Sequence, residues 1–170
     1  MVADPPPIIP PMSSSTILLH IELKKISVDR AALSCQRADG TVTWSRVSAF
    51  FPTHDLTHYA VESTLGFRHG FFGLIAEGWH LADFTQPGVA ARLPREALVA
   101  ENIVGHVERL GTEMPLEEFQ SALDDTLAAH KLPPFELSLE GYERLAETRR
   151  ALLADWAALP VGETLTVDFP

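Results

Sequence analysis

The sequence is short of cysteine and of basic residues, and these shortages exclude several classes of protein. Cys35 is the only cysteine among 170 residues, so the chain forms no internal disulfide, which fits a reducing compartment. Thirteen lysines and arginines stand against 23 aspartates and glutamates, which gives a formal net charge of −10. Nucleic acids and anionic membranes bind concentrated basic surfaces, so we expect neither as a partner.

Long apolar runs are also missing. No stretch approaches the roughly 18 to 20 consecutive apolar residues that cross a bilayer. The first residues have neither the basic start nor the continuous apolar segment of a signal peptide, and we therefore expect a cytoplasmic protein. Hydrophobic residues make up 46% of the chain and charged residues 21%, a mixture typical of one globular domain with a proper core.

Proline and serine are concentrated at the start of the chain. Residues 1–15 read MVADPPPIIPPMSSS. Proline favours extended conformations and removes backbone hydrogen-bond donors. We expect residues 1–15 to form a disordered tail, with a proline-motif ligand for another protein as the alternative, and residues 16–170 to form a single domain.

Three segments have the pattern of β-strands. Residues 16–26 alternate apolar and polar side chains, which indicates a half-buried strand. Asp39-Gly40 separates two strand-like segments, and this dipeptide is a strong signal for a hairpin turn because glycine tolerates a positive φ. Cys35 falls in the first arm of that hairpin and reads as a small core residue. Near the C-terminus, ETLTVDF alternates again and predicts a strand that returns to the sheet.

The middle of the chain has helical periodicity. Predicted helices span residues 53–65, 69–79, 94–110 and 115–130, and a long helix follows a capping Ser138 and ends at Pro160. Gly66 ends the first of them. The order of strand, hairpin, helices and strand predicts an α+β fold in which a small antiparallel sheet packs with about five helices.

Residues 54–80, HDLTHYAVESTLGFRHGFFGLIAEGWH, hold four of the seven histidines. His54 and His58 are four residues apart, a spacing that places both rings on one helix face where both can ligate one metal ion. If two helices run antiparallel around Gly66, Glu77 comes close to this pair. Glu62 lies eight residues from His54, roughly 12 Å along the axis, and is too far to share an ion with both histidines. His80 remains a reserve ligand.

The same segment resembles the motif of the gluzincin metallopeptidases. That family carries H-E-x-x-H, a gap of about eighteen residues and a glutamate ligand on the next helix; this sequence reads His54-Asp55-Leu56-Thr57-His58, then eighteen residues, then Glu77-Gly78. The resemblance implies that His54, His58 and Glu77 bind zinc and that Asp55 stands at the position of the general base. Aspartate is one methylene shorter than glutamate. We therefore expect zincin-like binding of a divalent metal with degenerate or absent peptidase activity.

In the alternative interpretation, residues 54–80 do not bind a metal ion. In that case the helical hairpin is structural core, and His54 and His58 form hydrogen bonds with Glu77 or Glu62. The protein is then a non-catalytic interaction or regulatory module that contacts a protein partner or forms a homo-oligomer. The sequence contains no glycine-rich nucleotide motif and no Gly-x-Ser-x-Gly nucleophile elbow.

Overall fold

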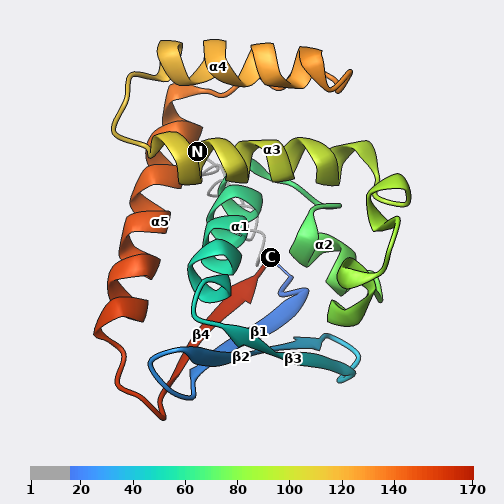
Figure 1. Cartoon of the computed structure of the whole chain (residues 1–170), viewed down its shortest axis with the longest axis vertical. Coiled ribbons are helices and arrows are strands. Elements are labelled where there is room, and N and C mark those ends of the chain that lie inside the picture. The colour runs from blue at the N-terminus through green and yellow to red at the C-terminus, as the bar shows by residue number, and fades with distance from the viewer. Residues whose placement is uncertain (1–15) are drawn as a thin grey trace, which may run out of the picture.

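A four-stranded sheet forms the base of the molecule (Figure 1). The computed structural model describes residues 16–170, so the predicted tail at residues 1–15 lies outside the described residues. The strands are β1 (Leu19–Lys25), β2 (Arg30–Arg37), β3 (Val42–Ser48) and β4 (Thr164–Phe169). They pair antiparallel in the order β3-β2-β1-β4. The predicted sheet of an N-terminal strand, a hairpin and a C-terminal strand is confirmed.

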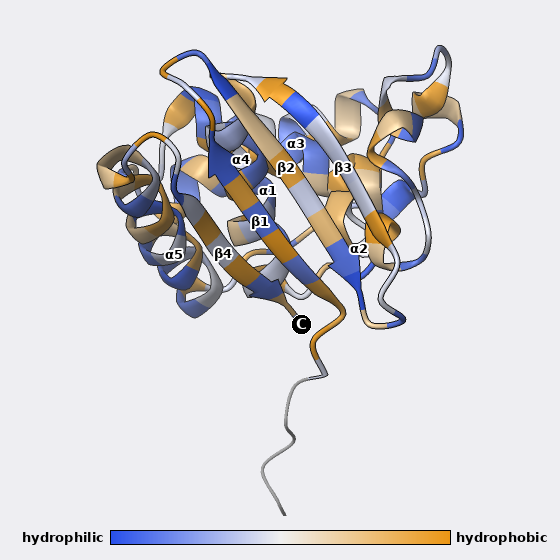
Figure 2. Ribbon diagram, turned by 90° about the horizontal axis from the view of Figure 1, so that it is seen from below, coloured by the Kyte–Doolittle hydropathy of each residue, from blue (hydrophilic) through white to orange (hydrophobic). Residues whose placement is uncertain are grey.

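Each strand follows the predicted alternation, with one face buried. The apolar residues of β1 on the inner face are at most 1% exposed: Leu19, Ile21 and Leu23. Cys35 pairs with Ile21 and is fully buried, as expected of a core residue. Figure 2 looks onto the opposite face of the sheet, and the helices lie behind it. The sheet thus has one dry side and one side in water, a common arrangement of antiparallel sheets.

The hairpin turn between β2 and β3 confirms the Asp39-Gly40 prediction. Gly40 has φ +85°, and the Asp39 carboxylate accepts hydrogen bonds from the Thr41 backbone N–H and hydroxyl at 2.9 and 2.7 Å. The turn also determines which β3 side chains face the core. Thr43 pairs with Cys35 and is buried, so Trp44 points to solvent and is 64% exposed.

Within residues 16–170, five helices follow the hairpin in the places that the periodicity indicates. They are α1 (Phe51–Leu65), α2 (Phe71–Ala76), α3 (Arg95–Leu110), α4 (Leu116–Ala129) and α5 (Leu139–Ala158), with short 3-10 turns at Leu81–Thr85 and Val89–Ala91. Gly66 ends α1 in the left-handed conformation, and the Ser138 hydroxyl caps α5 by accepting from Gly141 N–H at 3.0 Å. The second helix is shorter than the predicted 69–79, because the chain turns at Gly78, where φ is +116°.

The helices stack on one face of the sheet. In Figure 1, α1 lies between the sheet and α3, α5 runs beside α1, and α4 packs on α3 at the far side. One cluster of buried side chains joins the sheet to α1 and α2, and a second joins α1 to α3, α4 and α5. Helix α1 therefore contributes to both cores, and its polar side chains are held between them. Within residues 16–170, no helix has the length and hydropathy needed to cross a membrane.

Candidate metal centre

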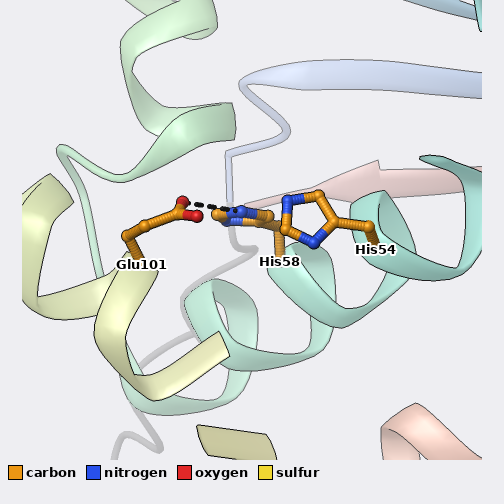
Figure 3. Close-up of side chains that lie close together, drawn as sticks. All are labelled: His54, His58 and Glu101. Carbon is orange, nitrogen blue, oxygen red and sulfur yellow. Dashed lines mark ion pairs between the residues drawn. The ribbon is translucent and has the colours of Figure 1, made fainter. Parts of the chain in front are cut away.

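Two histidines of α1 meet a glutamate of α3. His54 and His58 lie one turn apart, and Glu101 reaches them from the facing helix (Figure 3). Each of the three offers one ligand atom, and these atoms lie within 4.8 Å of one another. Among the residues that the structure describes, these three form the group with the spacing of a metal site. Imidazole nitrogen and carboxylate oxygen are a donor set that zinc accepts.

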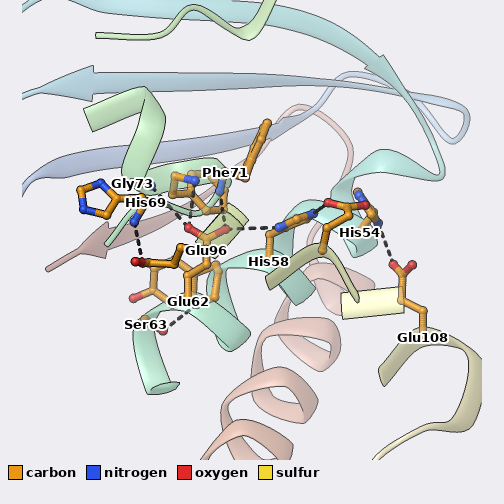
Figure 4. Close-up of polar contacts among 12 residues, drawn as sticks. His54, His58, Glu62, Ser63, His69, Phe71, Gly73, Glu96 and Glu108 are labelled. Atoms are coloured by element: carbon orange, nitrogen blue, oxygen red, sulfur yellow. Dashed lines mark hydrogen bonds and ion pairs between the residues drawn. The ribbon is translucent and has the colours of Figure 1, made fainter. Parts of the chain in front are cut away.

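Both imidazoles also have a carboxylate partner on their other side (Figure 4). Nδ1 of His54 lies 3.0 Å from Oε1 of Glu108, and Nδ1 of His58 lies 3.2 Å from Oε1 of Glu62. An ionised carboxylate only accepts hydrogen bonds, so Nδ1 is the donor in both pairs. This arrangement assigns Nε2 of each ring to the ligand side. Nε2 of His58 lies 3.1 Å from Oε2 of Glu101.

The site is closed at its inner end and open at its outer end. The side chain of His58 is 5% exposed, whereas those of His54 and Glu101 are 21% and 56% exposed. The two imidazole rings pack edge to face with centroids 4.7 Å apart. Phe50 stacks on His54 and Phe71 packs against His58, so an aromatic row holds both rings in place.

Two carboxylates raise the pKa of the buried imidazole of His58. Burial lowers the pKa of His58, but hydrogen bonds to Glu101 and Glu62, together with the charges of both, outweigh burial and raise it to about 10. The same contact lowers the pKa of Glu101. Protonated His58 thus bridges the carboxylates of Glu62 and Glu101. A metal ion bound at Nε2 would lie between His58 and Glu101.

Asp55, the residue at the predicted general-base position, lies outside the three-residue group. Its side chain is 3% exposed, and within residues 16–170 its Oδ2 has no hydrogen-bond partner. Burial raises the pKa of Asp55 to about 7, with the charge of His58 opposing the shift and that of Glu108 adding to it. The charge of its carboxylate also helps to raise the pKa of Cys35 in β2.

Glu77, predicted as the third ligand, also lies outside the group. Its Oε1 is 2.6 Å from Nδ1 of His69, in a pair that is about half exposed. The prediction assumed a long second helix antiparallel to α1. Helix α2 has only six residues and Glu77 is its C-cap, so Glu77 is not held on a helix that runs alongside the histidine pair. The side chain of His80, the reserve ligand, is not in the group either.

The sequence-based prediction did not include Glu101 or Glu108, and it gave Glu62 a role only in the metal-free alternative, as a hydrogen-bond partner of His54 or His58. The first two lie seven residues apart on α3 and therefore share a face over two turns. That spacing is visible in the sequence, but it does not tell which helix this face of α3 meets. Glu62 is indeed not in the ligand group, yet it contacts His58 from the following turn of α1.

Comparison with models of known protein families, with curated proteins and with solved structures found no match. The gluzincin resemblance therefore depends on residues 54–78 alone, and the geometry of the site carries the functional argument.

Proposed function

We propose that the protein binds a divalent metal ion, zinc in the first instance, through His54, His58 and Glu101. The supporting observation is that each histidine donates its Nδ1–H to a carboxylate, which leaves Nε2 as the nitrogen that can bind the metal. Histidines that bind metals nearly always donate their other ring N–H in this way, because the hydrogen bond fixes the tautomer and the ring orientation.

The distances and charges of the site are compatible with such an ion. Ligands at 2.0–2.1 Å in a tetrahedron lie about 3.4 Å from one another, so atoms within 4.8 Å need only small side-chain movements. Glu62, Glu101 and Glu108 surround the two imidazoles. A metal ion would replace the proton on Nε2 of His58 and balance this negative charge.

The coordination set leaves room for a further ligand. Two imidazoles and one carboxylate serve zinc hydrolases and also non-haem iron(II) enzymes, and in both an open position admits water or substrate. We propose metal binding without peptidase chemistry, because the predicted base, Asp55, is buried. A catalytic role for Asp55 stays a prediction.

Elemental analysis of protein purified without a histidine tag tests the proposal. We expect about one metal ion per chain, lost in His58→Ala and kept in His20→Ala, since His20 lies on the solvent face of the sheet. Anaerobic purification keeps iron(II) from being oxidised, so that the elemental analysis can distinguish it from zinc. The proposal would be contradicted if the wild-type protein is purified without metal and its melting temperature does not change when zinc or iron(II) is added.

A second pair of variants identifies the third ligand. Glu101→Gln should weaken zinc binding by more than the roughly 10- to 100-fold that loss of an outer partner costs. Glu77→Gln should leave the affinity unchanged, since Glu77 pairs with His69. The reverse result would restore the ligand set of the gluzincin motif and exclude Glu101.

The alternative function, a non-catalytic interaction module, has one observation in its favour. Trp44 and Phe50 expose 64% and 62% of their surface, and aromatic residues are enriched at protein interfaces. In this alternative the protein is metal-free, and His58 is a buried cation held by Glu62 and Glu101. The elemental analysis separates the two functions.

A further inference from the structure

Glu62 is a fully buried carboxylate that is held from two sides (Figure 4). On one side its Oε1 accepts the Nδ1–H of His58 at 3.2 Å. On the other, its oxygens accept the backbone N–H groups of Phe71, Phe72 and Gly73 at 2.8, 3.0 and 3.4 Å. A buried carboxylate is costly unless it is hydrogen-bonded, so these contacts fix where the carboxylate lies.

Gly70 makes the space that this carboxylate occupies. Its φ of −79° and ψ of −162° are open to any residue, so the backbone does not require glycine here. A Cβ at this position, however, would lie 2.4 Å from Cδ of Glu62 and within 2.8 Å of both its oxygens. Any side chain at residue 70 therefore displaces the carboxylate from the place where it meets His58.

We propose that Glu62 is a positioning residue for the metal site and that it links the metal ion to the first turn of α2. This inference rests on the proposed function. A fixed acceptor at Nδ1 orients the His58 ring and keeps the Nε2 lone pair directed at the ion. Because the same carboxylate holds the N–H groups of Phe71 and Phe72, an ion that fixes His58 also fixes the start of α2.

Two variants weaken the contact by different routes. Glu62→Gln removes the charge, whereas Gly70→Ala leaves Glu62 intact and pushes its carboxylate away. Gly105→Ala is the matched control, because a Cβ on Gly105 of α3 meets nothing within 4 Å. Circular dichroism and thermal melting of the metal-free proteins identify the variants that fold.

Zinc affinity, measured by competition with a chromogenic chelator, is the first readout. We expect roughly 10- to 100-fold weaker binding in Glu62→Gln and Gly70→Ala, and wild-type affinity in Gly105→Ala. The visible absorption bands of the cobalt(II)-loaded protein should also change in the first two variants, since these bands report the ligand geometry and not the stability. Folded Glu62→Gln and Gly70→Ala proteins with wild-type affinity and spectrum would overturn the inference and leave the proposed function standing.

Hydrogen exchange in the wild-type protein tests the link to α2 without any variant. Zinc should slow exchange of the Phe71, Phe72 and Gly73 amides more than that of amides in α4, which packs on α3 at the far side of the molecule. Equal slowing in both helices would overturn the link. A wild-type protein that binds no zinc at all would overturn the proposed function and this inference together.

Discussion

The buried carboxyl of Asp55 should make the metal-free protein less stable as the pH rises, and Asp55→Asn should remove that loss. Burial, with a contribution from Glu108, raises the pKa of Asp55 from 3.8 to about 7. An acid with a raised folded-state pKa ionises more easily in the unfolded chain. Folding stability therefore falls once the pH exceeds 3.8, and the loss is complete above about pH 7. At about 1.36 kcal/mol per pKa unit, roughly three units correspond to about 4 kcal/mol.

Chemical denaturation of the metal-free protein in a chelator measures this effect. Between pH 5 and pH 8, the free energy of unfolding of Asp55→Asn relative to wild type should increase by about 2–3 kcal/mol. The buried amide has its own cost of about 1–3 kcal/mol at every pH, so the change with pH and not the absolute difference is diagnostic. Asp125→Asn, at an exposed position of α4, is the control and should give a curve parallel to wild type. If Asp55→Asn gives a parallel curve too, the Asp55 carboxyl does not titrate as a buried, unpartnered group.

Two further predictions concern burial and helix propensity. Burial and the charge of Asp55 raise the pKa of the Cys35 thiol to about 12. A maleimide should therefore label Cys35 only after denaturant unfolds the protein. Rapid labelling in native buffer at pH 7 would contradict this prediction. Gly105 is exposed within α3 with open space around its Cβ position, so Gly105→Ala should raise the free energy of unfolding by about 0.5–1 kcal/mol, and a lower denaturation midpoint would contradict it.

The fold could be predicted because its signals are local. Alternation marks the strands, Asp39-Gly40 marks the hairpin, and the helical periods and Ser138 mark the helices. The exception is the end of α2. Residues 69–79 are mainly apolar, and this composition does not distinguish a long buried helix from a short one followed by a turn. The chain turns after α2 because Gly78 has a positive φ. The sequence does not reveal this, because glycine also adopts negative φ values.

The candidate site was predictable only in part, for the same reason. That His54 and His58 lie side by side follows from their spacing on one helix, and their ring centroids are 4.7 Å apart. Glu101 is more than 40 residues further along the chain, and its meeting with the pair depends on how α3 crosses α1. The gluzincin-like motif suggested Glu77 instead, and in the structure Glu77 pairs with His69 and lies outside the group of His54, His58 and Glu101.

The position of β1 between β2 and β4 has a consequence for synthesis on the ribosome. β2 emerges directly after β1, but β4 follows only after about 115 further residues beyond β3, on the order of ten seconds at bacterial or eukaryotic translation rates. During that interval the edge of β1 from Leu19 to Lys24 lacks its pairing strand, Thr164–Phe169. A nascent chain held at this stage presents an open strand edge beside the apolar face of the sheet, which is the kind of surface that pairs with other chains or recruits a chaperone.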